Sequence, residues 1–142
     1  MKIETTRFGT VTIKKDEIID MPFGIPGFPY QTKFVILEHK KNSPFLWYQS
    51  SEDPSLAFVI TDPHLFKPDY AVNMDNIIKE LSWEQEVEKD QLKLYVIVNI
   101  PNGAPDKTTA NLIGPLVMNP VTRQAVQLII PDSPYSHKFP LV

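Results

Sequence analysis

Apolar and polar residues alternate in short stretches of the chain, which is the pattern of half-buried β-strands. Val11 and Ile13 alternate with threonine and lysine, and Gly9 just before them predicts the turn of a hairpin within the first 14 residues. Near the other end, Val126, Leu128 and Ile130 share one face of a run that begins at residue 122. Both stretches predict strands with one buried face.

Four further runs are apolar on both faces, which is typical of central strands in a closed or doubly covered sheet. They comprise residues 34–37, 45–49, 56–61 and 94–98. Each has the usual length of a strand in a globular protein. Additional strands are expected around residues 108–113 and 116–119.

Helical spacing occurs in one region, around residues 74–90. Ile77, Ile78 and Leu81 fall on one face of a helix, for which Asn73 or Asp75 is the expected cap. Ser82 begins a Ser-x-x-Gln capping box, which predicts a second helical turn. We therefore expect one kinked helix or two brief ones.

Proline supports the same interpretation, because the chain holds 14 prolines among its 142 residues. This share is about twice the usual value of about 5%. Proline is excluded from helix interiors and central strands, so the composition favours short strands joined by shaped loops. One such loop is residues 21–30, which we expect to be held down by apolar side chains: Phe23, Ile25, Phe28 and Tyr30.

These patterns predict an all-β fold. We expect residues 1–142 to form a single compact β-barrel-like domain of short antiparallel strands, with a short helical insertion around 74–90. A barrel removes the open strand edges that such a sheet would otherwise expose.

Composition narrows the chemistry. The absence of cysteine excludes disulfides, thiol catalysis and thiolate metal sites. The longest apolar runs have five residues, against about 20 for a membrane-spanning helix, and the first residues do not form a signal peptide. A cytoplasmic protein that contacts no membrane is therefore expected.

The formal net charge of −3 is unevenly distributed. Six acids and two lysines lie between Asp75 and Asp90, which leaves −4 in this segment and +1 in the rest of the chain. One interpretation is a solvated helix face. The other is an acidic patch that steers a basic partner. For the second, the candidate partner-binding residues are Glu80, Glu84, Glu86, Glu88 and Asp90.

Catalytic motifs are scarce. The three histidines lack metal-ligand spacing, so no metal or cofactor is expected. Asp53-Pro54 and Asp62-Pro63 are better explained as turns at strand ends than as catalytic acids. An enzyme or small-ligand barrel using Asp62, His64 and Asn111 remains an alternative, and it requires a deep pocket where these groups converge.

Two further alternatives concern recognition of other molecules. The Gly24-Ile25-Pro26-Gly27 stretch superficially matches a nucleic-acid-binding loop, but it lacks basic residues, and the acidic chain disfavours direct RNA binding. On the strand at 45–49, alternation places Phe45 and Trp47 on one face and Tyr48 on the other. If the Tyr48 face is exposed, Tyr48 is a candidate interface anchor.

Six segments, taken together and in order, resemble the flagellar assembly factor FliW family. They are Arg7-Phe8-Gly9 before a Val-x-Ile strand, residues 24–28, 43–50, 56–63 and 109–119, and Arg123-x-Ala125-x-Gln127. The resemblance covers nearly the whole chain. The motif residues expected to have structural roles are Gly24, Gly27, Phe28, Gln49, Asp62, Pro63, Asn111, Pro115 and Gln127.

The resemblance implies a β-barrel-like protein without catalytic activity in the bacterial cytoplasm. It implies two protein partners, which are flagellin before its export and CsrA, a basic dimer that represses translation by binding messenger RNA. In that family the free protein binds CsrA and lifts repression, and new flagellin then takes it away. A chain that is monomeric when free is expected.

Overall fold

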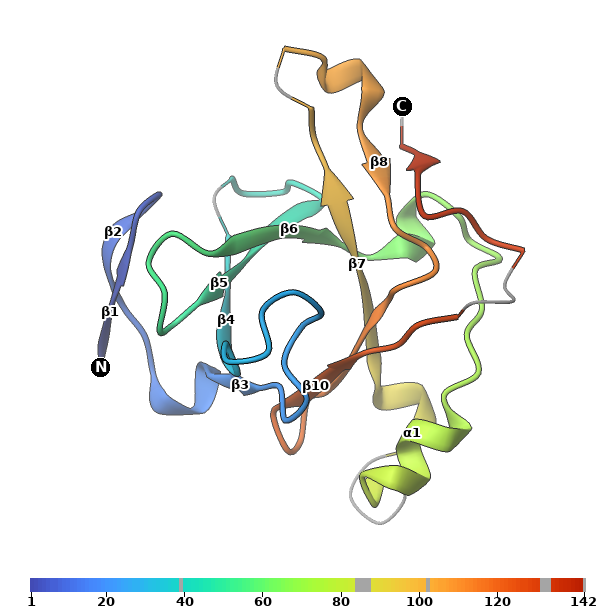
Figure 1. The fold of residues 1–142 in the computed structure, drawn as a ribbon, viewed down its shortest axis with the longest axis horizontal. Helices are drawn as coiled ribbons and strands as arrows, with labels where there is room; N and C mark the ends of the chain where they lie inside the picture. Colours follow the sequence, from blue (N-terminus) through green and yellow to red (C-terminus); the bar gives the residue numbers. More distant parts are fainter. Residues whose placement is uncertain (39, 84–87, 102, 131–133, 142) are drawn as a thin grey trace.

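The structure is a computed structural model that describes residues 1–38, 40–83, 88–101, 103–130 and 134–141 (Figure 1). Its elements are strands with few helical turns. The strands are β1 (Lys2–Thr5), β2 (Gly9–Thr12), β3 (Ile19–Asp20), β4 (Lys33–Leu37), β5 (Phe45–Ser50), β6 (Ala57–Thr61), β7 (Lys93–Asn99), β8 (Thr109–Ala110), β9 (Leu116–Asn119), β10 (Gln124–Gln127) and β11 (Phe139–Pro140). The α-helix among these residues is α1 (Asp75–Glu80), and short 3-10 turns are η1 (Lys15–Glu17), η2 (Pro63–Leu65), η4 (Lys89–Gln91) and η5 (Pro105–Lys107).

Strands β3 to β7, β9 and β10 close into a barrel. Neighbours follow the order β7-β6-β5-β4-β3-β10-β9, and a further pairing between β7 and β9 completes the ring. All of these pairs are antiparallel except β3 with β10, which meet in parallel at Asp20 and Gln124. The all-β barrel prediction is confirmed, with this one parallel pair as a departure from it.

The barrel interior holds the main apolar core. Phe34 and Tyr48 stack at its centre with ring centroids 4.6 Å apart. Alternate residues of β6 and β7 belong to the same cluster, and Phe58 of β6 is the direct cross-strand neighbour of Tyr48. The strand runs are apolar on both faces because further segments of the chain pack against the outside of the barrel.

Three smaller clusters provide that outer layer. The β1–β2 hairpin lies over β4 through Ile3, Ile13 and Val35. The segment around α1 packs on β9 and β10, where the buried Trp83 donates a hydrogen bond from Nε1 to Gln124 Oε1 at 2.9 Å. The third cluster joins β7 and β8 to the last residues of the chain. In Figure 1 the hairpin stands beside the barrel, and the β7–β8 arm rises from it.

The helical region is shorter than its spacing suggests. The N-cap residue is Met74, which makes no side-chain capping bond, so the predicted cap at Asn73 or Asp75 is wrong. Asn73 Oδ1 accepts a hydrogen bond from the backbone N–H of Asp75 at 3.0 Å beside this start. The helix ends at Glu80, and Ser82 follows with a left-handed φ of 56°. The predicted capping box continues into residues 84–87, which lie outside the described residues.

The loop at residues 21–30 is ordered by fewer side chains than expected. Ile25 is buried, and Phe28 packs edge-on against Phe58 at 5.9 Å. Phe23 and Tyr30, by contrast, are 59% and 89% exposed, so their predicted anchoring role is wrong. Backbone bonds hold the loop instead, including one from the Phe28 N–H to the Ile25 carbonyl at 2.7 Å.

Tyr48 does not meet the condition set for an interface anchor. Its side chain is 1% exposed, because the Tyr48 face of β5 is the one that points into the barrel. Burial raises the pKa of its phenol. Its hydroxyl has no hydrogen-bond partner among the described residues. The face of Phe45 and Trp47 is the partly exposed one.

Two tyrosines provide a test of these core contacts. The buried Tyr70 hydroxyl donates to the Leu112 carbonyl at 2.6 Å, whereas the Tyr48 hydroxyl donates to none of the described groups. We expect Tyr70→Phe to lower the free energy of unfolding by about 1–3 kcal/mol, because a buried carbonyl loses its donor. Tyr48→Phe should leave it unchanged or raise it. Urea unfolding of both variants measures the difference, and an equal loss in both would contradict the assignment.

Gly24 gives a second test, because two constraints act on it. Its φ is +64°, and a Cβ there would lie 2.9 Å from the backbone oxygen of Pro29. Gly9 has a similar φ of +67° but open space around it. We expect Gly9→Ala to cost roughly 1–2 kcal/mol of unfolding free energy. Gly24→Ala should cost about 1–3 kcal/mol more, since the loop backbone must shift. Similar losses in urea unfolding would refute the steric argument.

Candidate functional site

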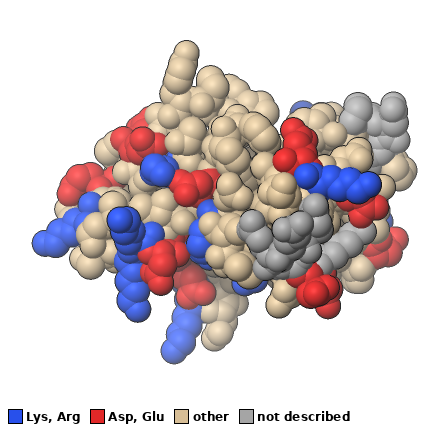
Figure 2. All heavy atoms as spheres, turned by 90° about the horizontal axis from the view of Figure 1, so that it is seen from below, with Lys and Arg blue, Asp and Glu red and all other residues tan. Residues whose placement is uncertain are grey.

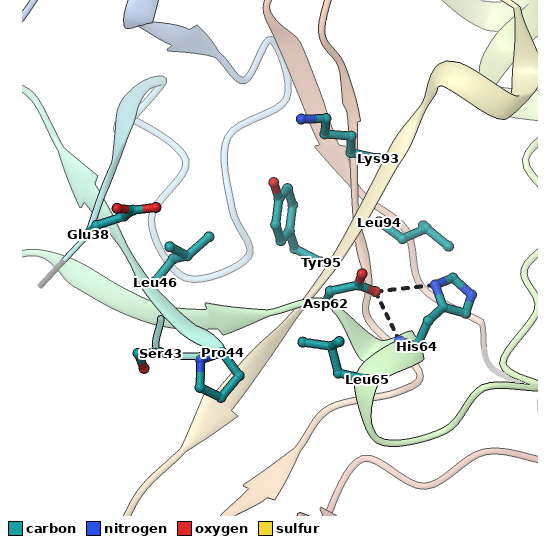
Figure 3. Close-up of a pocket in the computed structure, with 10 residues that line it drawn as sticks. All are labelled: Glu38, Ser43, Pro44, Leu46, Asp62, His64, Leu65, Lys93, Leu94 and Tyr95. Carbon is teal, nitrogen blue, oxygen red and sulfur yellow. Dashed lines mark hydrogen bonds and ion pairs between the residues drawn. The ribbon is translucent and has the colours of Figure 1, made fainter. Parts of the chain in front are cut away.

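A hollow of about 480 Å³ lies at one end of the barrel (Figure 3). It forms where β4 and β6 end and where β5 and β7 begin, which antiparallel pairing brings to the same end. Its charged and polar lining comes from Glu38, Asp62, His64, Lys93 and Tyr95. It is the place in the described structure where an enzyme-like arrangement would be expected.

The Asp62–His64 pair is already engaged within the chain. Asp62 Oδ1 accepts a hydrogen bond from the His64 backbone N–H at 2.9 Å and lies 3.2 Å from His64 Nδ1. On the other side of the ring, His64 Nε2 lies 2.9 Å from the Tyr70 carbonyl, which can only accept. The pair thus fixes the turn η2 to the chain at Tyr70, and the predicted turn role of Asp62-Pro63 is confirmed.

The third residue of the enzyme alternative lies elsewhere. Asn111 does not line this hollow, and its Oδ1 accepts a hydrogen bond from the Ile113 N–H at 3.1 Å. Tyr95 does line it, and burial, followed by the nearby Asp62 charge, raises the pKa of its phenol. Tyr95 therefore remains a neutral hydroxyl. The convergence of Asp62, His64 and Asn111 that the enzyme alternative requires is not found.

The described acids of the helical insertion around residues 74–90, which we call the acidic insertion, are exposed to solvent. Glu80 at the end of α1, Glu88, and Asp90 in η4 are exposed. Glu84 and Glu86 lie outside the described residues. On the side of the molecule where Figure 1 places α1, Figure 2 shows acidic side chains around the grey atoms. Together with Asp75, which is also exposed, these acids share one segment whose local net charge is negative.

Several motif residues hold loops at the ends of strands. Gln49 is fully buried, and its Nε2 lies within 3.3 Å of four backbone carbonyl oxygens in and around the β5–β6 turn. Gln127 Nε2 donates to the Gly114 carbonyl at 2.9 Å, next to the buried Pro115. Gly27, like Gly24, has a positive φ in the loop that Phe28 closes. The geometry of these side chains is that of loop fixation.

One feature of the surface escaped the sequence reasoning. Trp47 is half-buried on the outer wall of the barrel, where the Arg7 guanidinium lies 4.3 Å from its ring centroid and Phe8 packs edge-on at 6.1 Å. Alternation along β5 places Trp47 on the face opposite Tyr48. Because both faces of β5 are apolar, alternation alone does not indicate that the Tyr48 face points into the barrel.

The described part of the chain has neither a metal-ligand cluster nor a membrane-spanning helix. No three His, Asp or Glu side chains there come together as a group that could hold a metal ion. No helix there is long and apolar enough to cross a membrane.

Comparison with known proteins gives a consistent result. The family model described as FliW protein matches residues 2–141. A flagellar assembly factor FliW from Alkaliphilus metalliredigens is 41% identical over 140 residues, which cover 97% of this chain and 84% of the relative. One from Moorella thermoacetica is 35% identical over 142 residues, covering 99% and 88%.

A solved structure agrees with these sequence matches. The crystal structure of a flagellar assembly factor FliW superimposes with a TM-score of 0.87 at 34% identity, covering 100% of this chain and 97% of that one. The relatives are named as assembly factors rather than enzymes. The resemblance predicted from the ordered motifs is confirmed over nearly the full length: the chain belongs to the FliW family.

Proposed function

We propose that this chain is a non-enzymatic flagellar assembly factor that binds flagellin and CsrA in the bacterial cytoplasm. The observation that carries the proposal is the full-length family match, since relatives at 34–41% identity carry the name of flagellar assembly factor. The barrel end supports the non-enzymatic part of the proposal, because the Asp62–His64 pair is already engaged with the chain's own backbone.

The proposed role is a switch between two partners. The free chain, as a monomer, binds CsrA and lifts its repression of flagellin synthesis. Newly made flagellin then takes the chain away, and repression resumes. In this scheme the chain senses the pool of flagellin that has not been exported. It binds no RNA itself, which agrees with its acidic balance.

The acidic insertion supports the CsrA part of the proposal. CsrA is a basic RNA-binding protein, and Glu80, Glu88 and Asp90 are exposed acids on one short segment. Exposed charges of this kind mainly speed diffusional encounter and contribute less to the lifetime of a complex. We therefore assign these residues a steering role in association with CsrA.

Charge reversal tests this assignment. The triple variant Glu80→Lys, Glu88→Lys and Asp90→Lys should associate with CsrA about tenfold more slowly at low salt, and the rate should depend less on salt than that of the wild type. A control variant with the same change in net charge carries Asp16→Lys, Glu52→Lys and Asp106→Lys, which are exposed acids outside the insertion. Stopped-flow measurement at several salt concentrations compares the association rates of the wild type, the insertion variant and the control variant.

The position of the charge, and not its sum, decides this experiment. If the control variant slows association as much as the insertion variant, only the overall charge matters. If neither variant differs from the wild type, the insertion has no steering role. Either result would contradict the steering role assigned to Glu80, Glu88 and Asp90.

Partner exchange has its own test. When the chain is bound to immobilised CsrA and flagellin is added in excess, we expect the chain to leave CsrA and appear in a complex with flagellin, because the proposed switch requires the two complexes to be mutually exclusive. Quantitative pull-down measures both fractions, with an unrelated acidic protein as the control. A stable assembly of all three proteins would contradict the exchange mechanism while leaving binding itself intact.

A further inference from the structure

The outer wall of the barrel carries an apolar groove that no element of the described chain covers. Three adjoining hollows, of about 200 to 490 Å³ each, share Trp47 as a lining residue. We call this surface the Trp47 groove. It is lined mainly by Arg7, Phe8, Phe45, Trp47, Val59 and Ile100.

The groove results from the way the outer layer is built. The β1–β2 hairpin covers β4, and the third outer cluster covers part of β7 and packs against Phe45 and Val59. Between them the outward residues of β5 and β6 remain partly exposed, and in Figure 1 these two strands run between the hairpin and the β7–β8 arm. Ile100, directly after β7, is 44% exposed at the edge of the groove.

The charged residues that line the groove have one sign. Among the described lining residues these are Arg7 and Lys40, and no acid lines any of the three hollows. The Arg7 guanidinium lies 4.3 Å from the Trp47 ring centroid, and it has no ion-pair partner among the described residues. Stacking on the ring leaves the N–H groups at the edge of the guanidinium free for a carboxylate.

We propose that the Trp47 groove binds a linear peptide segment of a partner protein in which an aromatic or aliphatic side chain is flanked by Asp or Glu. The apolar side chain inserts against Trp47, Val59 and Ile100, and a neighbouring carboxylate pairs with Arg7. Tryptophan and arginine are the residues that most often dominate binding energy at protein interfaces. This surface is separate from the acidic insertion, so the inference does not depend on the proposed function.

Selection of peptides tests both the chemistry and the location. A library of random 12-residue peptides displayed on phage is selected against the full chain, and the enriched peptides are synthesised. We expect them to combine Phe, Leu or Ile with adjacent Asp or Glu. Arg7→Glu and Trp47→Ala should each weaken their binding by about tenfold or more. Lys15→Glu, an exposed lysine that lines none of the three hollows, is the matched control and should bind as the wild type does.

Tryptophan fluorescence gives an independent readout of where the peptide binds. Trp83 is 0% exposed and Trp47 is half-buried, so acrylamide quenching of the wild-type chain reports chiefly on Trp47. Binding of an enriched peptide should reduce that quenching. Because Arg7 is exposed, Arg7→Glu should retain the urea unfolding midpoint of the wild type and so separates loss of binding from loss of fold.

The proposal is overturned by any of four results. The library shows no enrichment; the enriched peptides are basic or uncharged; Arg7→Glu binds the acidic peptides as well as the wild type does; or the peptides leave the quenching of Trp47 unchanged. Analytical ultracentrifugation of the chain alone tests whether a second copy of this chain occupies the groove. Self-association that Arg7→Glu abolishes would assign the groove to a second copy of this chain and would also overturn the proposal.

Discussion

The architecture depends on how β7 divides its hydrogen bonding. One edge pairs with β6 through Val96–Val98. Along the other edge, Lys93–Tyr95 pair with β9, whereas Val98 and Asn99 pair with β8. Between these two partners, the Ile97 carbonyl accepts a hydrogen bond from the Asn111 N–H at 2.9 Å, so the edge is used without a gap. The first half of the strand closes the barrel, and the second half begins the arm.

The way β7 divides its pairing determines where the Trp47 groove and the hollow beside Asp62 lie. The second half of β7 stays paired with β6 through Val96–Val98, and residues 97–100 line the Trp47 groove beside the outward residues of β5 and β6. At the opposite end of the same strand, Lys93 and Tyr95 stay in the barrel and line the hollow beside Asp62. Closure of the ring also satisfies backbone groups that an open sheet would expose.

Much of this fold was predictable from local patterns, but the choice between inside and outside was not. The strand runs and the hairpin follow from alternation and turn residues, and Asp53 and Asp62 cap turns as Asp-Pro predicts. On β5, however, both faces are apolar, so periodicity separates Tyr48 from Trp47 without saying which is buried. That choice is made by residues distant in sequence, chiefly Phe34, which stacks on Tyr48. The parallel β3–β10 contact and the split of β7 are likewise long-range.

The acidic insertion and the Trp47 groove carry charges of opposite sign and lie at opposite ends of β7. The acidic segment ends with η4, just before β7 begins, and Ile100 follows directly after β7 ends. A long-range coupling between such surfaces requires an element with two arrangements that each partner binds with different affinity. Strand β7 is paired on both edges and packed on both faces, which makes it a poor candidate for that element. Two occupants of these surfaces would therefore influence each other through steric overlap or the charges of their own bodies rather than through movement of the barrel.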